Sequence, residues 1–182
     1  MNTARRRLAV GAAILAIVGF VASYGAIATA GNSSRTFKVQ LTGYQEDPLT
    51  VSTTGSGTLR LKVDGQDKKL TYQLRYANLS GSVTQAHIHF GGVAQSGGIS
   101  AWLCQTATNP GPVGTPDCPA SPGTVTGTIE AANVVGPTGQ GIEAGAMEEL
   151  LDALRAETTY VNVHSTRFAG GEIRSQIADH HH

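Results

Sequence analysis

Three histidines are the residues of this chain whose type and spacing best fit a chemical site. His87 and His89 are two positions apart, and His164 lies in a separate stretch of the sequence. Side chains two apart on a β-strand share one face. Neutral imidazole is a ligand of Zn²⁺ and Cu²⁺, and three imidazoles with an open fourth position form such a site. Provided that the two stretches are neighbouring strands, the sequence predicts one copper or zinc ion.

Apolar residues alternate with the histidines in both stretches. Ala86, Ile88 and Phe90 share one side of the first stretch, and Val161 and Val163 share one side of the second. An apolar side of a strand faces the core. We therefore expect the imidazoles on the outer wall of the sheet, where hydrogen bonds to Ser, Thr or backbone groups are the alternative to a metal.

Polar residues beside the histidines are candidates for supporting roles. A metal-bound imidazole needs a partner for its second nitrogen, and Asn162 or Glu172 could supply one. Glu172 is alternatively a fourth, oxygen ligand. Glu172 and Arg174 are themselves two positions apart. We expect a structural ion pair between them, with a clamp for a bound oxyanion as the alternative.

Catalytic signatures other than the histidines are missing from the sequence. It contains no Ser/His/Asp order, nucleophile elbow or phosphate loop, so no catalytic residue is predicted. His180, His181 and His182 follow Asp179 at the end of the chain. Residues 179–182 are therefore taken as a His-rich tail or tag remnant that can bind metal adventitiously.

Short alternating segments dominate the rest of the chain. One segment differs, because apolar residues from Met147 to Leu154 follow helical spacing among charged residues. Short strands separated by turns predict an all-β, antiparallel, Greek-key-like sandwich or barrel of about eight strands, with one short amphipathic helix over an opening or edge. The expected strands are 37–42, 59–63, 70–76, 83–90, 99–104, 124–130, 160–165 and 172–177.

Composition agrees with such a fold and argues against several protein classes. The 182 residues include 23 Gly, only 14% are charged, and the formal net charge is +0. This glycine content is unfavourable for a helical bundle or coiled coil. The chain has no basic run beyond Arg5–Arg7, so no nucleic acid is expected as a partner.

The first thirty residues predict export. Arg5–Arg7 precede an uncharged run, residues 8–30, which ends in Ala28-Thr29-Ala30. This pattern is typical of a secretory signal peptide, but the run is also long enough for an N-terminal membrane anchor. Residues 31–35 form a linker. The protein is expected to be periplasmic, secreted or anchored to the outer face of the cytoplasmic membrane, contacting the membrane only through residues 8–30 if these are uncleaved.

The two cysteines fit an exported protein. Cys104 and Cys118 enclose a short stretch rich in Pro, Gly and Thr. An even cysteine count on the exported side favours a disulfide. Their spacing of fourteen positions is not a metal-ligand signature.

Three motifs together resemble the CHRD domain, which was first described in chordin and also occurs in exported bacterial proteins. They are the stretches Gln85–Gly91, Tyr160–Ser165 and Phe168–Arg174. The resemblance places the domain at residues 36–178 and implies an all-β, extracytoplasmic module. It implies little chemistry, although in chordin the domain accompanies binding of a secreted growth factor.

Three functions are consistent with these observations. The first is an exported, non-catalytic binding module with one Cu/Zn site made by the three histidines, recognising an extracytoplasmic protein or envelope component. The second is a mononuclear copper or zinc enzyme, and the third is a structural or adhesive envelope protein without metal.

The His-x-His stretch is also similar to the copper strand of copper–zinc superoxide dismutase. With only three histidines outside the terminal three, a dinuclear dismutase is not expected.

Overall fold

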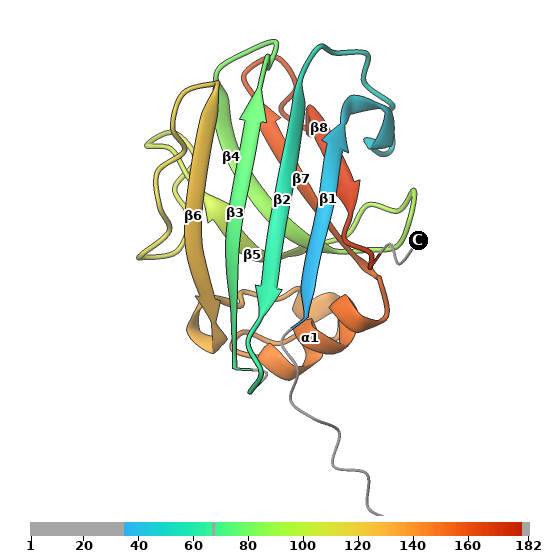
Figure 1. The fold of residues 1–182 in the computed structure, drawn as a ribbon, viewed down its shortest axis with the longest axis vertical. Helices are drawn as coiled ribbons and strands as arrows, with labels where there is room; N and C mark the ends of the chain where they lie inside the picture. Colours follow the sequence, from blue (N-terminus) through green and yellow to red (C-terminus); the bar gives the residue numbers. More distant parts are fainter. Residues whose placement is uncertain (1–34, 67, 180–182) are drawn as a thin grey trace, which may run out of the picture. The chain divides into compact units, whose positions relative to one another are not determined.

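Alternating apolar and polar residues form eight strands that pair into one antiparallel sheet, and the sheet curls into a nearly closed barrel (Figure 1). A computed structural model describes residues 35–66 and 68–179. The strand order is β5-β4-β7-β8-β1-β2-β3-β6. The strands are β1 Thr36–Thr42, β2 Ser56–Val63, β3 Lys69–Ala77, β4 Val83–Phe90, β5 Ile99–Cys104, β6 Gly123–Glu130, β7 Thr159–Ser165 and β8 Ile173–Gln176, the α-helix is α1 Met147–Arg155, and short 3-10 turns are Gly43–Gln45, Ala131–Asn133 and Thr138–Gln140.

The hairpin of β2 and β3 illustrates how the residue pattern specifies the sheet. Leu59 pairs with Leu74 and Leu61 with Tyr72, and all four side chains are buried. The residues between them point outward. In the turn, a carboxylate oxygen of Asp64 accepts a hydrogen bond from the backbone N–H of Lys68, 2.8 Å away. A slip of one residue would exchange the two faces, so the apolar residues determine the register.

The barrel is completed at the seam between its two terminal strands, β5 and β6. The Tyr72 hydroxyl crosses this seam from β3 and donates a hydrogen bond to the Leu103 carbonyl of β5, 2.7 Å away. An isolated antiparallel bridge links Ala101 of β5 to Val134, just beyond β6. These contacts hold the sheet edges together without a continuous ladder.

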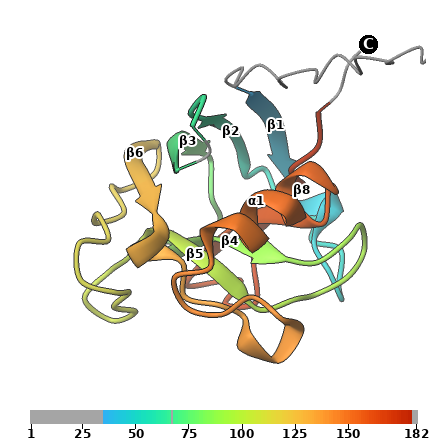
Figure 2. The ribbon, with the colours of Figure 1, turned by 90° about the horizontal axis from the view of Figure 1, so that it is seen from below.

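Helix α1 lies across the lower end of the barrel (Figures 1 and 2). Leu150, Leu151 and Leu154 are buried in the same apolar cluster as the strand residues. Their spacing places them on one helical face, while Glu148 and Glu149 remain exposed in the first turn. The helix therefore covers the open end of the barrel core, as its pattern predicts.

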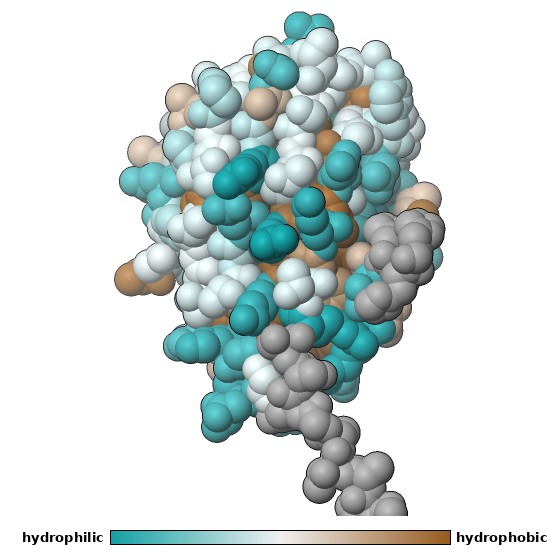
Figure 3. Space-filling model, viewed as in Figure 1, coloured by the Kyte–Doolittle hydropathy of each residue, from teal (hydrophilic) through white to brown (hydrophobic). Residues whose placement is uncertain are grey.

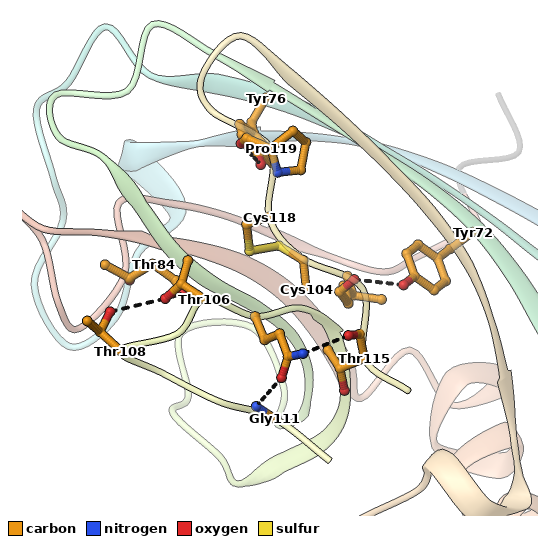
Figure 4. Close-up of a disulfide and its surroundings, with 12 residues drawn as sticks. Tyr72, Tyr76, Thr84, Cys104, Thr106, Thr108, Gly111, Thr115, Cys118 and Pro119 are labelled. Carbon is orange, nitrogen blue, oxygen red and sulfur yellow. Dashed lines mark hydrogen bonds between the residues drawn. A yellow bond between two sulfur atoms is a disulfide. The ribbon is translucent and has the colours of Figure 1, made fainter. Parts of the chain in front are cut away.

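A disulfide joins Cys104, at the end of β5, to Cys118 (Figure 4). Within the enclosed loop, the Gln105 amide donates to the Thr115 carbonyl at 2.9 Å and accepts from the Gly111 N–H at 2.7 Å. The Thr106 hydroxyl donates to the Thr84 carbonyl of β4. The loop is thus tied both to itself and to the sheet.

The predicted fold class, strands, helix and disulfide are confirmed. The signal or anchor segment 1–30, most of the linker and the last three residues of the tail lie outside the described residues. Among the described residues, no helix has the length and apolar character needed to span a bilayer.

Replacing both Cys104 and Cys118 with alanine is expected to lower the free energy of unfolding by about 3 kcal/mol, because the bond closes a loop of this length in the unfolded chain. Urea denaturation of oxidised parent and double variant measures the difference. Thr108→Ala, in the same loop, is the matched control and should change stability by less than about 0.5 kcal/mol. Equal unfolding free energies for parent and double variant would contradict the expectation.

Candidate metal centre

Pairing of β4 with β7 brings the three histidines together. His87 lies opposite Asn162, and Gln85 lies opposite His164, so His164 is the diagonal neighbour of His87 across the strand pair. Residues two apart on each strand share a face, and diagonal side chains on that face are within reach of each other. The register therefore places three imidazoles on one side of the sheet.

The three rings form a tight group. Their candidate ligand nitrogens all lie within 4.8 Å of one another. The ring centre of His87 is 5.3 Å from that of His89 and 5.0 Å from that of His164. The ring centres of His89 and His164 are 6.4 Å apart. Three neutral imidazoles at such separations can converge on one small cation after modest side-chain rotation.

The group lies on the outer wall of the barrel but is buried. Ala86 and Ile88, the apolar neighbours on β4, face the core as the alternation predicts. The exposed fraction of the residue is 1% for His87, 8% for His89 and 7% for His164. Loops, rather than a second sheet, must therefore shield this outer face from water.

The β4–β5 loop supplies one of these covers. Nδ1 of His89 is 2.9 Å from the Gly97 carbonyl oxygen. A carbonyl can only accept, so Nδ1 carries the proton and Nε2 presents its lone pair. Nε2 is buried without a hydrogen-bond partner. Only glycine fits at position 97, since a Cβ there would lie 1.7 Å from the Phe90 carbonyl oxygen.

The β7–β8 loop covers His164 and orients its ring through a backbone carbonyl. Its Nδ1 lies 2.9 Å from the Ala169 carbonyl oxygen and therefore donates. Its Nε2 lies 3.1 Å from Oδ1 of Asn162. With the ring neutral, that contact is favourable only when the amide turns its NH₂ group toward Nε2. A metal on Nε2 would release this contact, so Asn162 is placed at the edge of the centre.

His87 is the least satisfied of the three. Both of its ring nitrogens are buried and neither has a hydrogen-bond partner. Its ring meets the edge of Trp102, which lies opposite it on β5, with centres 4.3 Å apart. Trp102 is covered in turn by the disulfide loop, because a Cβ on Gly111 would fall 2.8 Å from the indole.

Burial keeps all three imidazoles neutral. Removal from water, reinforced by the neighbouring imidazoles, lowers the pKa of His87 to about 2. Burial also lowers the pKa of His89 to about 4, against the opposing hydrogen bond to Gly97, and lowers the pKa of His164. The neutral form is the one that binds a metal ion, so these rings are in the ligand state at neutral pH.

An aromatic stack supports His89 from the side. The ring of Tyr160 lies parallel to it, with centres 4.7 Å apart. The guanidinium of Arg174 lies over the other side of the tyrosine, 3.6 Å from the ring centre. Arg174 also donates to the carbonyls of Gly92 and Gln95 in the β4–β5 loop. The stack therefore fixes both His89 and the loop that orients it.

The predicted ion pair between Glu172 and Arg174 is replaced by other contacts. Arg174 approaches Asp47 at 3.9 Å. Oε1 of Glu172 accepts from the Thr53 hydroxyl and the Ser80 N–H, each at 2.6 Å. Burial acts to raise the pKa of Glu172, but its hydrogen-bond donors outweigh burial and lower it.

Glu172 is also not part of the ligand group, which comprises the three histidines. Its carboxylate instead links the β7–β8 loop to the segments around Thr53 and Ser80. Of the two supporting residues predicted from sequence, Asn162 contacts a histidine and Glu172 has a different structural role.

Four groups at the centre were not identified from sequence: the Gly97 and Ala169 carbonyls, Trp102 and the stacking role of Tyr160. The alternation of Tyr160 with Asn162 and His164 does place it on the same face. Nothing in the sequence shows which loop carbonyls fold over the rings.

Glu46 is another buried titratable group, and the charge of Arg174 acts on it. Burial raises its pKa to about 8, although the Arg174 charge acts in the opposite direction. Its Oε1 has no hydrogen-bond partner. At neutral pH this carboxyl is largely protonated. Its effect on how the free energy of unfolding changes with pH is therefore opposite to that of the histidines.

Stability of the metal-free protein is expected to fall as pH decreases from about 6.5 to 4. In this window the unfolded chain protonates its histidines, while in the fold His87 stays neutral and His89 begins to protonate only as the pH approaches 4. Each such group contributes up to about 1.4 kcal/mol per pH unit. Unfolding free energies of chelator-treated protein between pH 4 and 7 should therefore show a shallower slope for His87→Gln.

Glu46→Gln is the matched control and should change the slope in the opposite direction. The raised pKa of Glu46 makes the fold take up a proton between pH 4.5 and about 8, which stabilises it as pH falls. Removing that group should steepen the pH dependence. Identical slopes in parent and His87→Gln protein would show that His87 is not excluded from protonation by the fold.

Comparison with known proteins agrees with the fold and the motif positions. The family model described as CHRD domain matches residues 37–177, which is most of the chain. No curated protein and no solved structure matches the chain. The matched region contains the helix, the three histidines and the eight strands apart from Thr36, the first residue of β1, and the chain belongs to the CHRD domain family.

Proposed function

We propose that this protein is an exported, non-catalytic CHRD module that binds one Cu²⁺ or Zn²⁺ ion through His87, His89 and His164. The observation that carries the proposal is the state of His87, whose two ring nitrogens are buried without a hydrogen-bond partner beside two other neutral imidazoles. Leaving a buried polar group unsatisfied costs roughly 1–3 kcal/mol. A cation bound between the three rings would satisfy one of the two His87 nitrogens.

The supporting hydrogen bonds favour the same reading. Nδ1 of His89 and Nδ1 of His164 are occupied by the Gly97 and Ala169 carbonyls. Backbone carbonyls that accept from the distal nitrogen fix ring orientation and tautomer in metal sites. Nε2 of His89 and of His164 therefore carries the lone pair that could bind a metal ion. These hydrogen bonds would also form without a metal, so the unsatisfied nitrogens of His87 carry the proposal.

The choice of ion follows from the ligand type. Imidazole suits both Zn²⁺ and Cu²⁺, and the group contains no thiolate or carboxylate that would favour another class of metal. Three histidines leave room for a fourth ligand, such as water. Export is supported by the disulfide and by the family, because disulfides persist in oxidising compartments.

Titration with metal tests the proposal directly. The full chain with His180→Ala, His181→Ala and His182→Ala is treated with chelator, and Cu²⁺ is then added. Trp102 is the only tryptophan of the chain and contacts His87, so its fluorescence should be quenched with a stoichiometry of one ion per chain. Zn²⁺ binding is followed by the rise in midpoint temperature of unfolding that binding to the folded state produces.

His87→Gln and His164→Gln should each weaken binding by more than about 100-fold, since loss of an orienting contact alone costs 10–100-fold. Gln85→Ala is the matched control. Gln85 lies opposite His164 on the same face but offers no ligand nitrogen, so its affinity should stay within about twofold of the parent. Unchanged quenching and stabilisation in both histidine variants, with their folds intact, would refute the centre.

A further inference from the structure

A second polar surface lies on the other half of the barrel, over β1, β2 and β3. These three strands contain five basic side chains and no acidic one. All five point outward and are exposed. By contrast, residues 31–182 contain ten basic and thirteen acidic side chains in total. Cations are therefore concentrated on one face of an otherwise mildly acidic domain. The five are Lys38, Arg60, Lys62, Lys69 and Arg75.

Strand register turns four of these residues into a stripe. Lys38 on β1 lies directly opposite Arg60 on β2, and Lys62 follows two residues later on the same face. Arg75 on β3 lies opposite Thr58, two residues before Arg60. At about 3.4 Å per residue the stripe extends roughly 14 Å along β2. Figure 3 shows hydrophilic side chains gathered over the middle of this face.

No acidic side chain in the described part of the chain forms an ion pair with the stripe, that is, with Lys38, Arg60, Lys62 or Arg75. Like charges directly opposite each other destabilise a strand pair, and Lys38 with Arg60 is such a pair. The arrangement is unfavourable for the isolated fold and becomes favourable when a negatively charged partner covers it.

A hollow adjoins the stripe where Arg75 lies. Its volume is about 490 Å³, and it is shallow and largely open to solvent. Gln40, Thr58, Arg75 and Thr124 form a straight row across β1, β2, β3 and β6 and line it. Amide, hydroxyl and guanidinium groups are hydrogen-bond donors suited to sugar hydroxyls and carboxylates. The hollow could therefore hold one sugar unit beside the basic stripe, which attracts negatively charged groups.

This face exposes no large apolar or aromatic side chain in the described chain, and that argues against several classes of partner. The large apolar side chains exposed in the described chain all lie outside the strands; they are Tyr44, Leu49, Val93 and Val113. Without apolar anchors the face is poorly suited to a protein interface or to insertion into lipid. Phe37, Tyr72 and Tyr76 on these strands point into the core, so no ring is offered for stacking of nucleic-acid bases.

We propose that this basic stripe and the adjoining hollow bind an anionic polysaccharide, a polymer that carries carboxylate or sulfate groups along a sugar chain. Several exposed cations meet successive charges of the polymer, and the hollow holds one sugar beside Arg75. The contact is electrostatic, so it weakens as salt is added. It uses the face of the barrel formed by β1 to β3 and is independent of the histidine centre on β4 and β7.

Binding is tested with the full chain against polygalacturonate and dextran sulfate, which separate carboxylate from sulfate recognition, and against uncharged dextran. The triple variant Lys38→Gln, Arg60→Gln, Arg75→Gln should lose at least tenfold in affinity for the preferred polymer at 50 mM salt. Its unfolding free energy should not fall, since an unfavourable like-charge pair is removed. Affinity of the parent should decrease between 50 and 300 mM salt.

The triple variant Lys68→Gln, Arg155→Gln, Arg167→Gln is the matched control, because it removes the same charge outside the stripe. It should bind within about twofold of the parent. An equal loss in both triple variants overturns the proposal, since net charge alone would then explain binding. So does binding of the parent to phosphatidylglycerol vesicles or duplex DNA but to neither charged polymer. His87→Gln should bind polymer like the parent, which separates this proposal from the metal centre.

Discussion

The pairing of β4 with β7 is the constraint on which the candidate centre depends. It places His87 opposite Asn162 and diagonal to His164. An irregularity in the ladder between Val83 and Gln85 sets the alignment at the His164 end. Because side chains alternate between faces, a slip of one residue would move the imidazoles into the core and expose Ile88 and its apolar neighbours. The apolar residues between the histidines therefore determine the geometry of the centre as firmly as the histidines do.

Burial by loops converts this cluster from surface histidines into a candidate ligand set. Exposed imidazoles would titrate near pH 6.5, whereas the loops over β4 and β7 keep these rings neutral. The same loops supply the carbonyls that orient His89 and His164. Arg174 connects the two effects, because it packs on Tyr160 beside His89 and holds the β4–β5 loop by two carbonyls.

Sequence periodicity predicts the parts of this structure that depend on local alternation. The eight strands, the helix at the barrel end and the shared face of His87 and His89 follow from patterns spanning a few residues. The disulfide is predicted on a different ground, the even cysteine count of a chain expected to be exported. The partners of Glu172 and Arg174 do not, since they come from loops whose paths depend on the whole barrel. The basic stripe is hidden for a related reason: its cations alternate with apolar residues in separate strands, and only the register of β1 to β3 aligns them.

Both proposed sites lie outside the barrel wall, on opposite halves of one sheet. The core between them is apolar and continuous, and it holds the strands in register without contributing a ligand group. Each outer face differs in what covers it. Loops over β4 and β7 exclude water and favour neutral ligands for a cation, while β1 to β3 stay open and keep their charges solvated. A single sheet can thus present two chemically different surfaces. Where loops cover the sheet, the side chains are kept neutral, and where the sheet is exposed, the side chains keep their charge. Neither requires a change of fold.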